Sequence, residues 1–214
     1  MKQVLVNSKY LIQQQVFEDL ISFCYVGVTD YSNLPILIWK YKKEYLTSPL
    51  VRKLITISER LISVKHKHLL ALIDYYYDGK YFYTIYEGVQ SFERLEYFLK
   101  TSPTLDVNQL WRFSTKILDV MVFLEKQNLV AGTLNLSNLL VVGQQIKLSR
   151  IIIPSEILKH YWQDFVVVED SIFLAPEFIQ YQRYSIRSDI YSYGVLLYLF
   201  FSQKWPYKYV LKLD

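Results

Sequence analysis

The stretch SDIYSYGVLLY, residues 188–198, decides the fold of this chain. Together with the apolar residues 199–201 it predicts a helix from about residue 188 to 201 that has hardly a polar side. A helix that is apolar all round is normally buried, and residues 202–214 are too few to cover it. We therefore expect another protein subunit or a second copy of the chain on this helix, unless the N-terminal segment or the tail folds back over it. The expected interface residues are Val195, Leu196, Leu199, Phe200 and Phe201.

Three other fragments are informative, two before this helix in the sequence and one after it. They are LVAGTLNLSNLL at residues 129–140, FLAPE at 173–177 and QKWPY at 203–207. In protein kinases the catalytic loop usually reads V-H-R-D-L-K-P-x-N-I-L, the activation segment ends in Ala-Pro-Glu, and the central buried helix reads S-D-V-Y-S-x-G-V-x-L-Y before G-x-x-P-F. Each likeness is weak alone, but in this order and spacing they cover nearly the whole chain. The chain therefore resembles the protein kinase family, in a degenerate and C-terminally truncated form.

The resemblance implies an α+β protein with a two-lobe, protein kinase-like fold. Residues 1–87 are expected to form a small lobe with a five-stranded antiparallel sheet and one helix. Residues 88–214 are expected to form a truncated, mainly helical large lobe that ends shortly after the central helix. The residue patterns agree, because 10–41 alternate like three strands and an apolar stripe follows Ser48-Pro49 at helical spacing. Further expected elements are strands 69–76, 80–87, 138–142 and 145–149 and a helix after Asp106.

Composition sets the remaining limits. The chain has 214 residues, is 52% hydrophobic, and carries a net charge of +4 without a basic run, so nucleic acid is not an expected partner. One cysteine excludes an internal disulfide and fits a reducing compartment. No segment reaches the roughly 18–20 apolar residues of a membrane span. We expect an intracellular protein, soluble or peripheral within a complex, and its 20 tyrosines also suit the AT-rich genome of an organelle, endosymbiont or virus.

Against the kinase pattern, the groups that carry out phosphoryl transfer are replaced. Thr133 stands at the catalytic aspartate position and cannot accept a proton near neutral pH. Arg150 stands at the metal-binding aspartate position, although Mg²⁺ needs oxygen anions. Ile57 stands at the helix glutamate position, and residues 17–25 contain none of the glycines of a phosphate loop. The sequence therefore predicts a protein that is not an enzyme, with no catalytic residue, no metal and no cofactor.

Four kinds of family residue remain. Lys40 matches the strand lysine that pairs with phosphates, with Ile38 pointing where adenine would lie, and Asn138 matches the metal-binding asparagine. Both are interpreted as remnants, and the amide of Asn138 as a support for the loop backbone. Asp189 is expected to accept hydrogen bonds from the catalytic-loop backbone. The Ala175-Pro176-Glu177 motif is expected to be structural, and Glu177 is expected either to pair with Arg183 or Arg187 or to face water.

These observations lead to two hypotheses about the function. The leading hypothesis is a catalytically inactive kinase-like protein, a pseudokinase, that serves as a structural or adaptor subunit of a larger protein assembly. The alternative is a regulatory pseudokinase that binds nucleotide without metal through Lys40 and Arg150. An active phosphotransferase with unusual residues is the least favoured interpretation.

Overall fold

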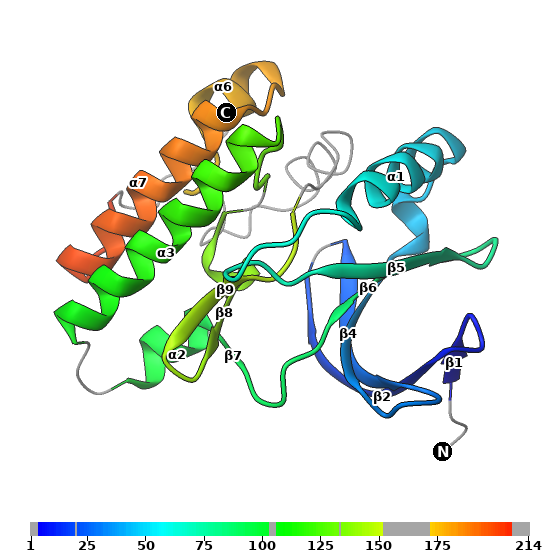
Figure 1. Ribbon diagram of the computed structural model, residues 1–214. Coiled ribbons are helices and arrows are strands. Elements are labelled where there is room, and N and C mark those ends of the chain that lie inside the picture. Colours follow the sequence, from blue (N-terminus) through cyan, green and yellow to red (C-terminus); the bar gives the residue numbers. More distant parts are fainter. Residues whose placement is uncertain (1–3, 20, 103–105, 133, 152–171, 207–214) are drawn as a thin grey trace.

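A curled antiparallel sheet lies beside a group of helices in the computed structural model (Figure 1). The structure describes residues 4–19, 21–102, 106–132, 134–151 and 172–206. The six strands follow the order β1-β2-β3-β4-β6-β5. They are β1 (Val4–Val6), β2 (Tyr10–Glu18), β3 (Ser22–Thr29), β4 (Pro35–Tyr41), β5 (Leu72–Tyr77) and β6 (Phe82–Glu87). The Tyr10 hydroxyl of β2 donates to Asp74 of β5 at 2.7 Å, so the sheet is curled strongly enough for distant strands to touch.

Strand β4 has two apolar faces because the sheet is covered on both sides. Ile36 and Ile38 pack with Tyr10, Tyr83 and other residues on one face. Leu37 and Trp39, one position further along, pack on the opposite face with the main core of the protein. This alternation is the ordinary period of two of a β-strand, and it fixes which side chains reach the helical part of the molecule.

Helix α1 (Ser48–Leu61) packs on the sheet, after the short 3₁₀ helix η1 (Lys43–Tyr45). It starts at Ser48-Pro49, as the sequence predicts, with proline in the first turn. Leu50, Leu54 and Leu61 are buried along one stripe. The apolar spacing therefore correctly predicted the face that the helix buries.

The helical part contains α2 (Leu95–Thr101), α3 (Val107–Lys126), α6 (Pro176–Tyr181) and α7 (Ile186–Ser202). A small sheet, β7 (Glu93–Arg94), β8 (Leu139–Val142) and β9 (Gln145–Leu148), and the 3₁₀ helix η2 (Leu136–Asn138) lie beside them. The carboxylate of Asp106 accepts from the Asn108 amide and caps α3, as expected for an acidic N-cap. Helices α3 and α7 lie side by side (Figure 1), and the Tyr193 hydroxyl donates to the Ser114 carbonyl at 3.1 Å.

The expected helices and strands around the main motifs are confirmed, but the sheet has six strands instead of five. The sequence analysis missed β1, β7 and α6, which have three, two and six residues. Elements this short are too small to show a period in the sequence. The boundary at residues 87 and 88 stays a prediction. Among the described residues, no helix combines the length and the hydropathy needed to cross a membrane.

The prediction of an uncovered central helix is wrong for three of its five interface residues. Val195, Leu196 and Phe200 are buried in the main core, on the side of α7 that packs toward α3. Leu199 is half-buried against the same core, and only Phe201 is exposed, at 45%. A neighbouring helix of the same chain therefore covers the side that the sequence left open.

Candidate functional site

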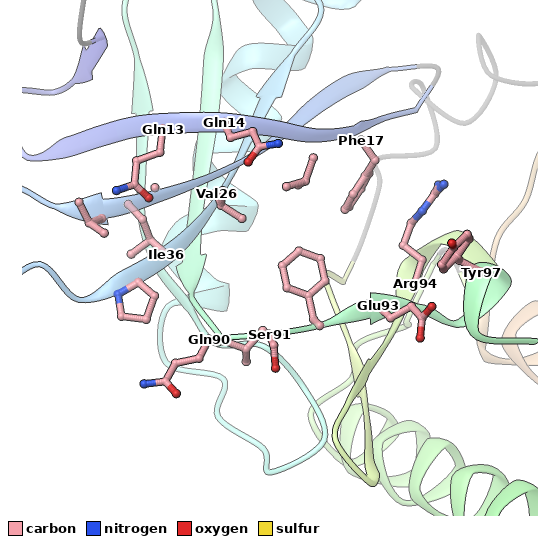
Figure 2. Close-up of a pocket in the computed structure, with 16 residues that line it drawn as sticks. Gln13, Gln14, Phe17, Val26, Ile36, Gln90, Ser91, Glu93, Arg94 and Tyr97 are labelled. Atoms are coloured by element: carbon pink, nitrogen blue, oxygen red, sulfur yellow. The ribbon is translucent and has the colours of Figure 1, made fainter. Parts of the chain in front are cut away.

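A groove of about 750 Å³ lies between the curled sheet and the segment that joins β6 to α2. Its sheet side includes Gln13, Phe17 and Val26, and its other side includes residues 89–94 and Tyr97. Figure 2 shows these side chains on the two sides of the opening, with the strands above and the connecting segment below.

One end of the groove is closed by aromatic side chains. The Arg94 guanidinium lies 5.2 Å from the centroid of the Phe17 ring, and Figure 2 shows both at the same end of the opening. Behind Phe17, the Trp39 ring packs edge-on at a centroid distance of 6.0 Å and also meets Tyr86 at 5.2 Å. The buried Trp39 therefore occupies space between the groove and the segment around Arg150.

The structure corrects the predicted direction of the Ile38 side chain. Ile38 is buried in the cluster on the face of the sheet opposite to the main core, and Lys40 Nζ lies 3.8 Å from the centroid of the Tyr81 ring. Because side chains alternate along β4, Trp39 points to the opposite face and is buried in the main core. Neither Lys40 nor Trp39 is among the residues that line the groove.

Arg150 forms an ion pair with the turn between β2 and β3. Its Nη2 donates to Asp19 Oδ2, and its Nη1 donates to the Ser22 hydroxyl at 2.9 Å. Its guanidinium carbon lies 5.6 Å from the centroid of the Trp39 ring. The other carboxylate oxygen of Asp19 accepts from the Ile21 amide at 3.0 Å and from the Ser22 amide at 2.7 Å. A cation and a carboxylate of the chain itself thus meet at the expected metal position.

The environment keeps Arg150 charged. Burial of the guanidinium acts to lower the pKa of Arg150, but the Asp19 carboxylate and the hydroxyls of Tyr41 and Tyr86 raise it above the usual arginine value. The side chain is 8% exposed and that of Asp19 is 17% exposed. Because the Arg150 side chain is buried and already paired with Asp19, it is not presented to an incoming phosphate. This geometry does not favour nucleotide binding through Lys40 and Arg150.

Asn138 supports the backbone beside Arg150. Its Nδ2 donates to the Arg150 carbonyl at 3.0 Å, and its Oδ1 accepts from the Ser149 hydroxyl. The Ser149 amide in turn donates to the Asn138 carbonyl at 2.9 Å. These bonds join η2 to the segment after β9, which agrees with the backbone-holding interpretation of this amide.

Asp189 lies at the start of α7 and accepts hydrogen bonds from the expected loop. The amides of Ala131 and Gly132 donate to its two carboxylate oxygens at 2.6 and 3.0 Å, and the Tyr184 hydroxyl donates at 2.8 Å. Burial raises the pKa of Asp189 above its usual value, and the three hydrogen bonds act in the opposite direction. The side chain therefore ties the 131–132 loop to the central helix.

The Ala-Pro-Glu motif forms the start of α6. Ala175 is its buried N-cap, and Pro176 is in the first turn, where a missing amide costs no helical hydrogen bond. Glu177 accepts from the Ser188 hydroxyl at 2.8 Å. Ser188 also takes part in the capping box of α7, so Glu177 connects the two helix starts.

Two predicted positions have different outcomes. Ile57 is half-buried and packs against the main core, while nearby Glu59 accepts from the Tyr75 hydroxyl at 3.3 Å. Thr133 lies outside the described residues.

Three residues around Arg150 were not predicted from the sequence as part of the site, namely Trp39, Asp19 and Ser22. The one available signal was the alternation in β4, which was ambiguous because both faces of that strand are apolar.

His66 and His68 lie where the segment between α1 and β5 meets α3. His66 Nε2 lies 3.5 Å from the Asp119 carboxylate, and the His66 ring stacks on Phe123 at 4.8 Å. The same carboxylate lies 3.1 Å from Lys67 Nζ. His68 is buried, and its Nδ1 has no hydrogen-bond partner among the described residues. Burial is the largest cause that lowers the pKa of both histidines, and the positive charge of Lys67 adds to it.

The lowered pKa values of His66 and His68 predict that the folded protein loses stability in mild acid. A histidine whose pKa is lower in the folded state stabilises the fold above the unfolded value of about 6.5, and this contribution is lost as the pH falls below it. We expect the urea midpoint to fall between pH 7.5 and pH 5.5 in the wild-type protein. In the double variant His66→Gln and His68→Gln the fall should be smaller, because both groups that take up protons are gone. An equal fall in both proteins would contradict this assignment.

The family model described as "Protein tyrosine and serine/threonine kinase" matches residues 15–213. The chain is 22% identical over 167 residues to serine/threonine-protein kinase PLK4 of Danio rerio, which covers 78% of this chain and 18% of that protein. It is 28% identical to serine/threonine-protein kinase ULK3 of Xenopus laevis (73% and 34% covered) and 29% identical to tyrosine-protein kinase Fer of Mus musculus (78% and 20% covered).

A solved structure supports the fold. The structure titled "Crystal structure of Rad53 1-466 in complex with AMP-PNP" superimposes with a TM-score of 0.74 at 16% identity. The match covers 94% of this chain and 50% of that chain. This chain therefore spans at most about half the length of the proteins that it is compared with here.

The comparisons contradict the prediction that the chain is not an enzyme. The matched family and the relatives named above are protein kinases, which are enzymes. Nothing in these comparisons separates this chain from them in activity.

Proposed function

This chain belongs to the protein tyrosine and serine/threonine kinase family, and we propose that it serves as a structural or adaptor subunit of a larger protein assembly. It joins the assembly through one surface of α3 and α7. This surface, called the α3–α7 face below, consists of Val107, Trp111, Leu118 and Val122 on α3 and Ile190, Tyr198 and Phe201 on α7.

The observation that supports the proposal is the exposure of these seven apolar side chains. Trp111 is 61% exposed, and Ile190 is 57% exposed. Soluble monomers rarely expose apolar patches larger than a few hundred Å², and larger patches usually mark interaction sites. Aromatic side chains such as Trp111 and Phe201 are also enriched among the residues that dominate binding energy.

The seven side chains form one continuous surface. On α3 the four residues fall within a narrow arc of the helix, since a residue advances by about 100°. On α7, Ile190 and Phe201 are about three turns apart and share one side. The two stripes meet where α3 touches α7, because the rings of Trp111 and Phe201 lie 6.0 Å apart. The face therefore spans both helices.

The test is the native size of the protein in fresh extract of its source cells. We expect the wild-type chain to migrate as a complex larger than one chain. The variant with Trp111→Glu and Phe201→Glu should migrate as a single chain, because a buried unpaired carboxylate is unfavourable at an apolar interface. The matched control is Tyr31→Glu, since Tyr31 is 91% exposed on the β3–β4 turn, away from this face. A wild-type protein that migrates as a single chain in extract would refute the proposed function.

A further inference from the structure

The α3–α7 face has the area that a dimer of this chain needs. An aromatic side chain buries about 150–250 Å² when fully covered and an aliphatic one less, so the exposed parts of the seven residues amount to roughly 600 Å² in each copy. Two copies would bury about 1,200 Å² of apolar surface, which is the lower limit of a standard stable interface before the rim is counted. The face is therefore large enough for a specific dimer.

The composition of the face also suits a second copy. None of the seven residues that define it is charged, and the other residues along the α7 stripe are Gly194, Leu197 and, one turn before Ile190 at the edge of the face, the exposed Arg187. Interfaces between identical subunits are more apolar than those between transient partners, and their centres are poor in charge. A partner recognised through acidic or basic groups would find no complementary charge at the centre of this face.

The two ends of the face differ in bulk. Trp111, Tyr198 and Phe201 form an aromatic end, while Val122 and Ile190 form a smaller aliphatic end. A twofold axis across the helices would place the aromatic end of each copy on the aliphatic end of the other. In such an isologous contact, residue i meets residue j and j meets i, so Phe201 would lie opposite Ile190 of the second copy.

Gly194 lies between these ends on the exposed side of α7. A glycine inside a helix is about 1 kcal/mol less favourable than alanine. Packing within the chain does not require it, because an added Cβ would meet nothing within 4 Å. A glycine here lets another backbone approach α7 closely, which suits a helix of a second copy crossing at the middle of the face.

We infer that the α3–α7 face binds a second copy of this chain, in a twofold dimer in which α7 packs antiparallel to its counterpart. The inference rests on the proposed function, because it names the partner for the same face. It requires no cofactor or third protein. The purified chain alone should therefore dimerise.

Light scattering of the purified full chain, from low to high micromolar concentration, tests the inference. We expect the mass of two chains for the wild type and for the Tyr31→Glu control. Phe201→Glu should raise the dissociation constant of the dimer at least about 30-fold, the effect expected for an aromatic side chain that dominates the binding energy of an interface. Circular dichroism should show that Phe201→Glu remains folded, because Phe201 is exposed at the end of α7.

A charge pair tests the predicted register. Ile190→Lys should weaken the dimer as Phe201→Glu does, because each single variant buries an unpaired charge. The double variant should recover much of the affinity, since the ammonium group introduced by Ile190→Lys in one copy would then lie against the carboxylate introduced by Phe201→Glu in the other. No recovery in the double variant would overturn the antiparallel register.

A wild-type chain that stays a monomer at high concentration would overturn the dimer. A monomer that nevertheless migrates as a face-dependent complex in cell extract would leave the proposed function standing with a different partner. A single chain in both experiments would refute both proposals. Failure of the dimer and failure of the proposed function therefore give different results.

Discussion

Replacing Arg150 by methionine is expected to lower the free energy of unfolding by about 3–5 kcal/mol, because removal of one partner of a buried ion pair leaves the other charge unpaired. The charge left behind is the Asp19 carboxylate, whose Oδ2 loses the Arg150 guanidinium. Methionine keeps much of the apolar volume against Trp39, so lost packing contributes little. Urea denaturation monitored by tryptophan fluorescence measures the change.

A double-mutant cycle separates the ion pair from its surroundings. Asp19→Asn keeps an oxygen that can accept from the Ile21 and Ser22 amides but removes the charge. The double variant with Arg150→Met should therefore be more stable than Arg150→Met alone, by about 1–3 kcal/mol. The control Lys100→Met removes an exposed pair with Glu96 and should change stability by about 0.5 kcal/mol or less. If Arg150→Met behaves like this control, the ion pair does not stabilise the fold.

Replacing Asp189 by alanine is expected to cost about 3–5 kcal/mol of unfolding free energy. The change leaves the amides of Ala131 and Gly132 and the Tyr184 hydroxyl without their acceptor, and each unsatisfied buried donor costs about 1–3 kcal/mol. The relief of burying a carboxylate, whose pKa burial raises, offsets part of this cost. The measurement is again the urea midpoint at neutral pH.

Graded variants distinguish hydrogen bonding from general disruption. Tyr184→Phe removes only one of the three donors and should cost about 1 kcal/mol. Asp30→Ala, on the exposed β3–β4 turn, should change stability by less than about 0.5 kcal/mol. Faster amide exchange at Ala131 and Gly132 in Asp189→Ala would locate the loss in the loop. If Asp189→Ala were as stable as Asp30→Ala, the stability of the 131–132 loop would not depend on Asp189.

Much of the architecture could be predicted because its signals are local. The stripe that starts at Ser48-Pro49, the cap at Asp106 and the branched residues of β4 each depend on neighbours within a few positions. The order of the kinase-like fragments then placed these elements in one family and one fold. Asp189 could be assigned its loop contact for the same reason, since its position in the SDIYSYG run is unambiguous.

The candidate site was harder, because its residues come together only across the fold. The strand pattern could not decide whether Lys40 or Trp39 lies on the face of β4 that packs into the main core, since apolar residues lie on both sides of β4. Asp19 and Arg150 are 131 positions apart, and the sequence around either residue does not indicate that they form an ion pair. The expected interface had the same weakness, because the packing of α3 decides which side of α7 is covered.

The sequence by itself determined the family, the order of helices and strands, and which residues stand at the positions of the kinase motifs. Only the tertiary structure decided that Arg150 pairs with Asp19 and that Trp39, not Lys40, lies on the face of β4 that packs into the main core. It also decided that the exposed apolar surface belongs to α3 as well as α7. The physical reason is that helix and strand periodicity is set by neighbours along the chain, whereas burial and charge pairing are set by segments that meet only after the chain folds.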